Sequence, residues 1–236
     1  MGRRCPTSPE HATAGPNLPG PLGRPLCNAD VRILFVCTGN ICRSPLGERL
    51  TRAFLDDALG ASAAEVGTGS AGTNAVVDSG MEPSSALVLS GLGGDPSGFR
   101  ARQVTGSMIE EADLTLTMTR RHRRAALKLA PRAMFRTYTL REAAALLPGI
   151  SVDALPPVGE LDARARMLVA ELGRQRATRP RSDRDEDDVL DPIGRRAEVH
   201  QEVGEQIFAS LIPLLQALCG TAADSTRTTP ATLTRA

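Results

Sequence analysis

Short β-rich runs alternate with amphipathic helical patterns along most of this 236-residue chain. The first run, Val31–Val36, reads VRILFV and has the apolar density of a strand that is buried on both faces. Pro45–Leu59 follows it with apolar residues at helical spacing and with proline near its start, where a missing N–H costs nothing. Such alternation places parallel strands side by side and helices over both faces of the sheet. It therefore predicts an α/β fold: a single three-layer domain with a four-stranded parallel sheet.

The same alternation continues along the chain. The further expected strands are Glu65–Ser70, Leu114–Met118 and Met134–Thr139. The further expected helices are Glu82–Leu92, Thr119–Leu129, Leu140–Leu147, Glu160–Arg176 and Ala197–Leu218. Pro213 falls inside the last of these patterns, so we expect the helix to kink or end there.

Three segments depart from the alternation. Residues 1–30 are dense in Pro and Gly and lack both apolar periodicity and the hydrophobic run of a secretory signal, which predicts a disordered N-terminal extension. Residues 220–236 are equally coil-like and predict a disordered tail. The domain then spans residues 31–219. Within it, residues 150–188 interrupt the alternation and predict an insertion or a lid-like segment that ends in an exposed, mixed-charge linker.

Composition excludes several classes of partner. Lys+Arg number 28 against 27 Asp+Glu, a net charge of +1, which argues against nucleic acid and acidic membranes as partners. No stretch approaches the roughly 18 apolar residues of a membrane span. The five cysteines form no regular framework, which favours a reducing, cytoplasmic setting, and no cluster of His and Cys suggests a metal. They are Cys5, Cys27, Cys37, Cys42 and Cys219.

The segment VCTGNICRSP lies between the first expected strand and the first expected helix. Backbone N–H groups converge in such a turn and the helix dipole is positive there, which predicts a cradle for an anion. Gly39 and Asn40 suit the turn, because both tolerate backbone conformations that most residues avoid. The N–H groups and Arg43 would favour the thiolate of Cys37, and the Arg43 guanidinium can fork onto two phosphate oxygens. Ser44 can hydrogen-bond the sulfur and make it a better leaving group.

This segment resembles the active-site loop of the bacterial low-molecular-weight protein-tyrosine phosphatases. The similarity covers roughly Val31 to Leu218, except for part of the segment before Asp188, and continues through further motifs in the family's order. These motifs are SAGT (Ser70–Thr73), ARQVT (Ala101–Thr105), EADLTLTMTRRHR (Glu111–Arg123) and DPIG (Asp191–Gly194). The resemblance implies a cysteine-dependent hydrolase of phosphomonoesters that needs no metal or other cofactor. Its substrates would be phosphotyrosine in proteins or small phosphomonoesters.

The resemblance also implies the roles of individual residues. Cys37 matches the nucleophile, Arg43 the arginine that binds phosphate and stabilises the transition state, and Asp191 the general acid. In the implied reaction the Cys37 thiolate attacks phosphorus while Asp191 protonates the departing oxygen. Water then hydrolyses the cysteinyl-phosphate, with Asp191 as the base. The phosphate-binding and loop-supporting positions are Thr38, Gly39, Asn40, Ile41, Cys42, Ser44 and Ser70.

Other aspartates compete with Asp191 for the role of the acid. They belong to the charged run before it and are read as solvated. They are Asp183, Asp185, Asp187 and Asp188. The following Pro192 and the match to the family's motif single out Asp191.

The chain departs from the family's pattern at the walls of the cleft. Many members carry aromatic residues directly after the Asp-Pro pair and after the SAG-type segment. Here Ile193 and Gly194 stand in the first place, and Thr73–Val77 holds no aromatic in the second. The phosphate chemistry survives this change, but stacking on a phenol ring is lost. Ile41 favours phosphotyrosine, because relatives that act on phosphoarginine tend to carry Thr at its position.

Two other functions stay open. Arsenate reduction occurs on the same fold, but it needs a redox cysteine pair in a segment after the second helix, and no cysteine lies between Cys42 and Cys219. A non-catalytic phosphate-binding module would need neither a nucleophile nor an acid. In addition, the family sometimes forms a reversible disulfide at the active site, and the proximity of Cys42 to Cys37 allows one here.

Overall fold

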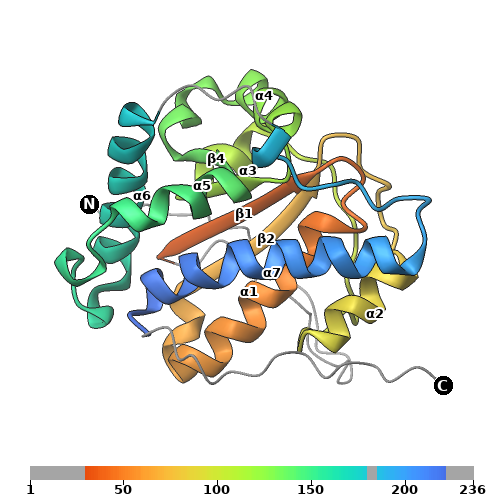
Figure 1. Ribbon diagram of the computed structural model, residues 1–236, viewed down its shortest axis with the longest axis horizontal. Helices are drawn as coiled ribbons and strands as arrows, with labels where there is room; N and C mark the ends of the chain where they lie inside the picture. The colour runs from red at the N-terminus through yellow and green to blue at the C-terminus, as the bar shows by residue number, and fades with distance from the viewer. Residues whose placement is uncertain (1–29, 180–184, 222–236) are drawn as a thin grey trace, which may run out of the picture.

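A four-stranded parallel sheet forms the centre of the computed structural model, which describes residues 30–179 and 185–221 (Figure 1). The strand order is β2-β1-β3-β4. The strands are β1 (Val31–Cys37), β2 (Val66–Gly72), β3 (Leu114–Thr117) and β4 (Thr137–Thr139). The predicted disordered segments at the two ends of the chain fall almost wholly outside the described residues and stay predictions.

Helices cover both faces of this sheet, which confirms the three-layer α/β prediction (Figure 1). One layer holds α1 (Arg43–Leu59), α2 (Pro83–Gly91), α5 (Leu140–Leu146), α6 (Leu161–Thr178) and α7 (Ala197–Cys219). The other holds α3 (Gly106–Glu111) and α4 (Arg120–Leu129). The 3-10 turns are η2 (Gly60–Glu65), η3 (Pro131–Arg136), η4 (Leu147–Gly149), η5 (Val152–Ala154), η6 (Val158–Glu160) and η7 (Asp185–Asp187).

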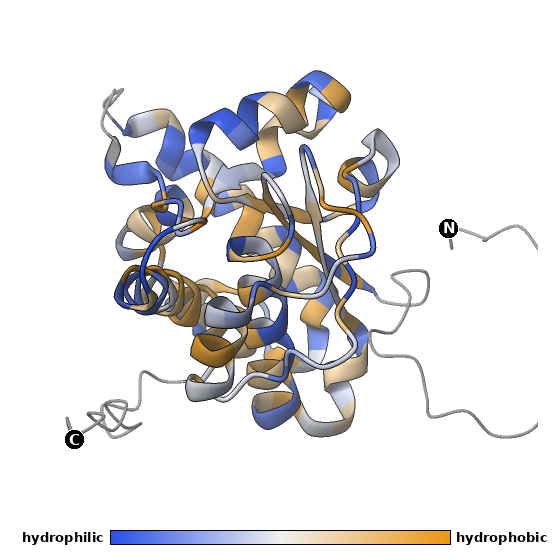
Figure 2. Cartoon of the chain, turned by 90° about the vertical axis from the view of Figure 1, so that its right-hand side faces the viewer, coloured by the Kyte–Doolittle hydropathy of each residue, from blue (hydrophilic) through white to orange (hydrophobic). Residues whose placement is uncertain are grey.

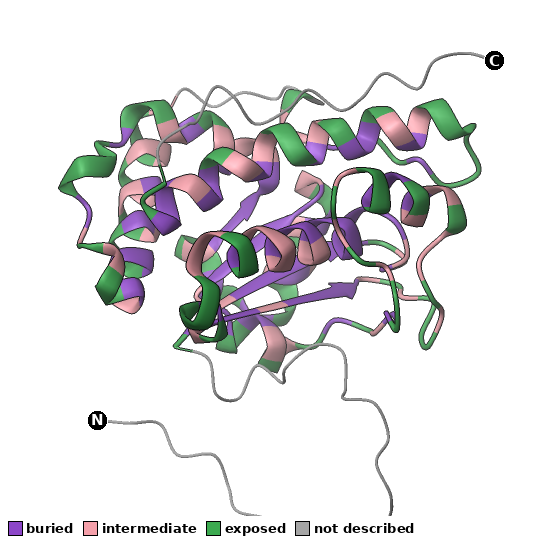
Figure 3. Cartoon of the chain, turned by 90° about the horizontal axis from the view of Figure 1, so that it is seen from below, coloured by how far each residue is buried: buried purple, intermediate pink, exposed green. Residues whose placement is uncertain are grey.

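The central strand β1 supplies side chains to both layers. Ile33 and Phe35 belong to the larger core, under α1 and α7, whereas Leu34 and Val36 pack with α3 and α4. This division follows from the two-residue period of a strand. Figure 2 shows apolar residues concentrated on the strands and the helix sides that face them, and Figure 3 shows the strands buried. A continuous apolar run was therefore the correct sign of a strand covered on both faces.

Most predicted boundaries lie within two residues of the observed ones, and two predictions were wrong by more. The fourth strand was expected over Met134–Thr139, but it covers only its last three residues, because Pro131–Arg136 forms a 3-10 turn. Phe135 within that turn is 74% exposed, so its apolar character does not mark a buried strand. The helix α7 does not end at Pro213 but continues to Cys219. Pro213 faces solvent, while the packing of the leucines around it holds the helix together.

The mixed-charge run Arg176–Asp188, which begins in the last turn of α6, was predicted to be exposed. Four of its charged residues, Arg176, Arg179, Asp187 and Asp188, are instead partly buried and have partners. The guanidinium of Arg176 stacks over the ring of Tyr138 at 3.5 Å and pairs with Glu142 at 2.8 Å. The Asp188 carboxylate accepts a hydrogen bond of 2.8 Å from the backbone N–H of Arg120. Charge composition alone cannot show such partners, because they come from distant parts of the chain.

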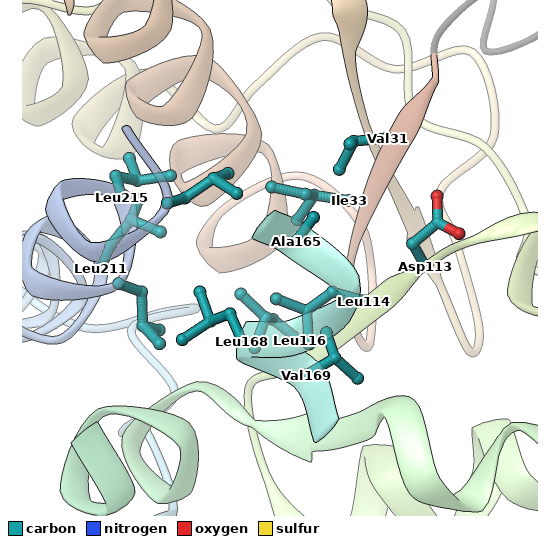
Figure 4. A pocket seen from close by; sticks show the side chains of 12 residues that line it. Val31, Ile33, Asp113, Leu114, Leu116, Ala165, Leu168, Val169, Leu211 and Leu215 are labelled. Carbon is teal, nitrogen blue, oxygen red and sulfur yellow. The ribbon is translucent and has the colours of Figure 1, made fainter. Parts of the chain in front are cut away.

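The helix α6 and its contacts lie at the end of the sheet opposite the carboxyl end of β1. A small apolar cavity of about 20 Å³ separates it from α7 and from the first residues of β1 and β3 (Figure 4). The residues that line the cavity are Val31, Ile33, Asp113, Leu114, Leu116, Ala165, Leu168, Val169, Leu211, Leu214, Leu215 and Leu218. In Figure 1, α6 stands at one end of the molecule and the segment that leads into α7 at the other.

Candidate active site

The loop between β1 and α1 is clamped through its carbonyl groups. The carbonyls of Cys37, Thr38, Gly39 and Ile41 accept hydrogen bonds of 2.8–3.0 Å from backbone N–H groups of residues 73–82. The chain passes so close here that a side chain at position 72 would meet the Thr38 carbonyl at 2.3 Å, which explains a glycine there. The hydrogen bonds from residues 73–82 thus hold the loop in place on its carbonyl side.

The same loop leaves its backbone donors unpaired. The N–H groups of residues 38–42 donate to no acceptor anywhere in the described residues. Asn40 reverses the backbone with a φ of 55°, in the left-handed region that Asn tolerates. Successive unpaired N–H groups at the start of a helix make a binding site for an anion, because buried donors need a partner and the helix dipole is positive there. This geometry has the form of the cradle expected from the sequence.

The buried side chain of Asn40 connects three parts of the site. Its Nδ2 donates to Ser44 Oγ at 2.9 Å and to Ser70 Oγ at 2.8 Å, and its Oδ1 accepts from the backbone N–H of Arg102 at 2.8 Å. The fully buried amide thereby satisfies three hydrogen bonds in three directions. The network holds the left-handed residue in place and ties the loop to β2 and to the segment before α3.

The sulfur of Cys37 lies at the base of the loop. Cys37 Sγ and Ser44 Oγ are 2.9 Å apart. Because Ser44 Oγ accepts from Asn40, its proton is left for an acceptor, and the sulfur is closer than the Ala71 carbonyl at 3.4 Å. This contact ties the Cys37 sulfur to the first turn of α1.

Sequence reasoning missed Glu48, which extends this network. The hydroxyl of Ser70 donates to Glu48 Oε2 at 2.6 Å, so a chain of hydrogen bonds runs from Glu48 through Ser70 to Asn40. Burial is the main cause that raises the pKa of Glu48, and the Ser70 hydrogen bond and Arg102 oppose it. Glu48 lies in the second turn of α1, and from the sequence it looks like any acidic residue on a helix.

Arg43 connects the loop to the segment that carries the predicted acid. Its Nη2 lies 2.7 Å from Asp191 Oδ2, and its Nη1 donates to the carbonyl of Val189 at 3.0 Å. The N–H of Val189 in turn donates to Met118, at the end of β3, at 2.8 Å. Arg43 is buried whereas the Asp191 side chain is 49% exposed, so the carboxylate stands over the loop on the solvent side.

The competing aspartates have other partners. Asp188 binds Arg120, and Asp187 pairs with Arg179 at 3.1 Å. Asp183 lies outside the described residues, and the side chain of Asp185 is not described. Of the described aspartate side chains in this run, Asp191 is the one paired with Arg43.

Sequence reasoning also passed over His122, which lies directly behind the loop. Its Nε2 is 2.8 Å from Thr38 Oγ1, and its Nδ1 is 2.9 Å from Thr119 Oγ1. Burial and the nearby Arg43 lower its pKa to about 4, so the ring is neutral at pH 7. Its position just after β3, where the carboxyl ends of parallel strands meet, was the signal that could have found it.

Cys42, the last residue of the loop, is buried beside a cluster of polar side chains. Burial raises the pKa of its thiol to about 11, although a hydrogen bond with Ser85 opposes the shift. Ser85 Oγ also lies 2.9 Å from His200 Nδ1, which is 3.1 Å from Glu82. Cys37, Cys42 and Cys219 are free thiols, and a Cys37–Cys42 disulfide stays a prediction.

The rim of the site is aliphatic. Val76, Val77 and Ile193 are about half exposed, and Val76 approaches the loop at Gly39 beside Ile41. These three rim residues lie in the two segments where the sequence carries aliphatic residues in place of aromatic ones. Among the described residues, no group of three or more His, Cys, Asp or Glu could hold a metal ion, and no helix has the length and apolar character to cross a bilayer.

Known proteins share this sequence pattern. The model of the family described as low molecular weight phosphotyrosine protein phosphatase matches residues 32–146. A putative low molecular weight protein-tyrosine-phosphatase of Klebsiella pneumoniae is 37% identical over 105 residues, which are 44% of this chain and 67% of that protein. The protein Wzb of Salmonella typhi, which carries the same family name, is 39% identical over 100 residues, 42% of this chain. The matched segment spans 62% of the length of Wzb.

Solved structures share the fold. The tyrosine phosphatase AmsI of Erwinia amylovora superposes with a TM-score of 0.54 at 21% identity, covering 81% of this chain and 93% of AmsI. The YwlE arginine phosphatase of Geobacillus stearothermophilus gives 0.56 at 24% identity, covering 80% and 92%. The low molecular weight protein tyrosine phosphatase of T. tengcongensis gives 0.56 at 26% identity, covering 79% and 98%. The chain belongs to the low molecular weight protein-tyrosine phosphatase family.

Proposed function

We propose that this chain hydrolyses phosphomonoesters through a cysteinyl-phosphate intermediate, with phosphotyrosine in proteins as the substrate class. One observation carries the proposal: a buried cysteine sulfur lies at the base of a loop whose N–H groups at residues 38–42 have no acceptor among the described residues, and Arg43 directly follows that loop. Such a site offers a nucleophile at the centre of a preformed set of donors for phosphoryl oxygens. The names of the curated relatives support the same reaction.

In the first step of the proposed reaction, the Cys37 thiolate attacks phosphorus in line with the departing oxygen. A P–S bond forms, the P–O bond to the leaving group breaks, and Asp191 gives its proton to that oxygen. The position of Asp191, half exposed and paired with Arg43, supports this role. The N–H groups of the loop and Arg43 stabilise the charge on the phosphoryl oxygens.

In the second step, water attacks the cysteinyl-phosphate while Asp191 takes its proton, and the sulfur departs as the thiolate. Ser44 supports this departure, because its hydroxyl lies 2.9 Å from the sulfur and can hydrogen-bond the developing negative charge. The alcohol or phenol leaves after the first step, and inorganic phosphate leaves after the second. Because the reaction needs a reduced sulfur, a cytoplasmic location is part of the proposal.

Release of phosphate from p-nitrophenyl phosphate tests the proposal directly. Cys37→Ser should abolish turnover while orthovanadate still binds, because the cradle is made of backbone N–H groups. Cys219→Ser is the matched control, since it changes a buried free thiol at the far end of α7 and should retain activity. Turnover by the Cys37→Ser variant would refute the nucleophile, and a wild-type protein that binds vanadate without turnover would be a binding module.

The aliphatic rim bears on the choice of substrate. Val76, Val77 and Ile193 offer apolar contact but no ring to stack on a phenol. We therefore expect phosphotyrosine to be hydrolysed with a smaller advantage over alkyl phosphates than an aromatic cleft would give. Rates with phosphotyrosine, phosphoserine and phosphoarginine peptides of one sequence measure this advantage, and a dominant rate with phosphoarginine would replace the proposed substrate class. Arsenate reduction is tested separately, by formation of arsenite in the presence of a thiol reductant.

A further inference from the structure

The ring of His122 joins two hydrogen bonds behind the loop, and its tautomer sets the direction of both. His122 is 4% exposed, whereas Thr38 is exposed at the mouth of the site and directly follows Cys37. The two ring nitrogens of His122 each face one threonine hydroxyl, Thr38 Oγ1 at 2.8 Å and Thr119 Oγ1 at 2.9 Å. A neutral ring donates at one nitrogen and accepts at the other. Either Nε2 donates to Thr38 and Nδ1 accepts from Thr119, or the reverse holds.

Thr119 decides between the two directions. Its Oγ1 already accepts the backbone N–H of His122 at 3.2 Å, as the N-cap of α4. Within the described residues, the proton of the same hydroxyl has His122 Nδ1 as its acceptor. If Nδ1 carried a proton, the hydroxyl proton of Thr119 would have no partner, which is unfavourable for a partly buried group. Nδ1 is therefore the acceptor and Nε2 carries the proton.

We propose that His122 is a positioning residue of the phosphate cradle. Its Nε2–H donates to the oxygen of the Thr38 hydroxyl, which leaves the Thr38 proton free to be donated to an oxygen of the bound phosphoryl group. Thr38 thus adds a side-chain donor to the backbone donors of residues 38–42. The inference rests on the proposed function in that it takes a phosphoryl group as the ligand of the cradle.

The surroundings of His122 keep its ring in the neutral form that this role requires. The charged groups near it are Arg43, Arg121, Asp188 and Asp191. Burial and the two arginines disfavour the imidazolium, and they outweigh the two carboxylates. A protonated ring would still donate to Thr38, but it would also donate to Thr119 and break the hydrogen bond that fixes the ring from behind.

The protonation of the His122 ring nitrogens gives a test that does not depend on activity. The ¹⁵N chemical shifts of the histidine rings, measured on the whole protein at pH 7, distinguish a protonated from an unprotonated ring nitrogen. The signal of His122 is the one that disappears in His122→Gln. We expect a neutral ring with the proton on Nε2. A proton on Nδ1, or an imidazolium, would overturn the inference even in a fully active enzyme.

A double-mutant cycle tests whether His122 acts through Thr38. The readouts are the affinity for inorganic phosphate, as a competitive inhibitor or by calorimetry, and kcat with p-nitrophenyl phosphate. Thr38→Val should weaken phosphate binding about tenfold or more, as expected for a hydrogen bond to a charged group, whereas Thr38→Ser should retain it. His122→Leu should cause a similar loss in the native background and little further loss in the Thr38→Val background.

Conservative replacement separates positioning from a merely structural role. His122→Gln retains an N–H donor near the place of Nε2 and should recover most of the phosphate affinity lost in His122→Leu. Equal losses from His122→Leu in both backgrounds, or no recovery with Gln, would refute the proposal. A wild-type protein that binds phosphate without hydrolysing it would refute the proposed function and leave this inference standing.

Discussion

At the scale of single residues, the site combines one ion pair with a network of neutral hydrogen bonds. Arg43 and Asp191 form the ion pair at 2.7 Å, while Asn40, Ser44 and Ser70 form the network beneath the sulfur. A dianionic substrate that enters the cradle competes with Asp191 for the same guanidinium. In the proposed reaction, this competition frees the Asp191 side chain from Arg43, and its protonated form then acts as the acid at the leaving group.

Removal of Asp191 should therefore affect substrates according to their leaving group. We expect Asp191→Ala to slow hydrolysis of phenyl phosphate by about 10²–10⁴-fold, the usual range for a general acid. The loss with p-nitrophenyl phosphate should be much smaller, because nitrophenolate departs without a proton. Rates over a series of substituted phenyl phosphates measure this dependence.

Asp188→Asn is the control for this measurement, since it changes a nearby carboxylate that is bound to Arg120 instead. Its effect should be the same for good and poor leaving groups. If Asp191→Ala also slowed all substrates equally, the acid would have to be another residue.

The sequence alone identified the site residues that belong to the segment VCTGNICRSP. Cys37, Arg43 and Ser44 lie within eight consecutive residues, so their spacing alone predicts that their side chains meet. Glu48 and His122 could not be assigned in this way. Their partners, Ser70 and Thr38, are 22 and 84 positions away, and these contacts depend on how the strands are ordered in the sheet.

At the scale of elements, the alternation of strand and helix patterns predicted the parallel sheet and its longer helices. The short helix α3 and the 3-10 turns were not predicted. The helix α3 has six residues and too little periodicity to be recognised. The 3-10 turn Pro131–Arg136 carries apolar residues that mimic a strand. In both cases the local sequence is ambiguous and the tertiary packing decides.

The position of α6 leads to a prediction about residues 150–188, for which the sequence suggested an insertion or a lid. Leu168 is buried beside the small cavity (Figure 4). The cavity lies at the start of β1, and Cys37 lies at its other end. Leu168→Ala should lower the free energy of unfolding by about 2–5 kcal/mol, because it removes buried methyl groups and enlarges the void. Denaturant unfolding measures this loss, and kcat/KM well below the midpoint of unfolding should stay at the wild-type value.

Met167→Ala provides the comparison, since Met167 is 41% exposed on the same helix. Its effect on unfolding should stay within about 0.5 kcal/mol. A change of kcat/KM in Leu168→Ala without a loss of stability would instead favour a lid that acts on the active site.

At the scale of the whole molecule, burial of His122 couples folding to pH. The pKa of this group is about 4 in the folded protein and 6.5 as its ordinary value. Below pH 6.5 the unfolded chain binds a proton that the folded protein does not, so stability is fully present above that pH and falls as pH decreases toward 4. The loss from this group is at most about 3 kcal/mol.

His122→Gln carries no titrating group at this position and should lose less stability over the same range. Thermal or denaturant unfolding of the wild type and the variant from pH 7 to pH 4 measures the two slopes. Identical slopes would mean that the ring already titrates near its ordinary value in the folded protein.

The clamp on the carbonyl side of the loop has a consequence for the thermodynamics of ligand binding. To rotate its peptide groups away from the cradle, the loop would have to break several of the hydrogen bonds that residues 73–82 make to it. An incoming dianion therefore meets a receptor whose conformational entropy was already given up during folding. Its affinity then reflects mainly the replacement of water by protein N–H donors. Residues 73–82 contribute to this affinity through their hydrogen bonds to the loop, because those bonds hold the donors in place.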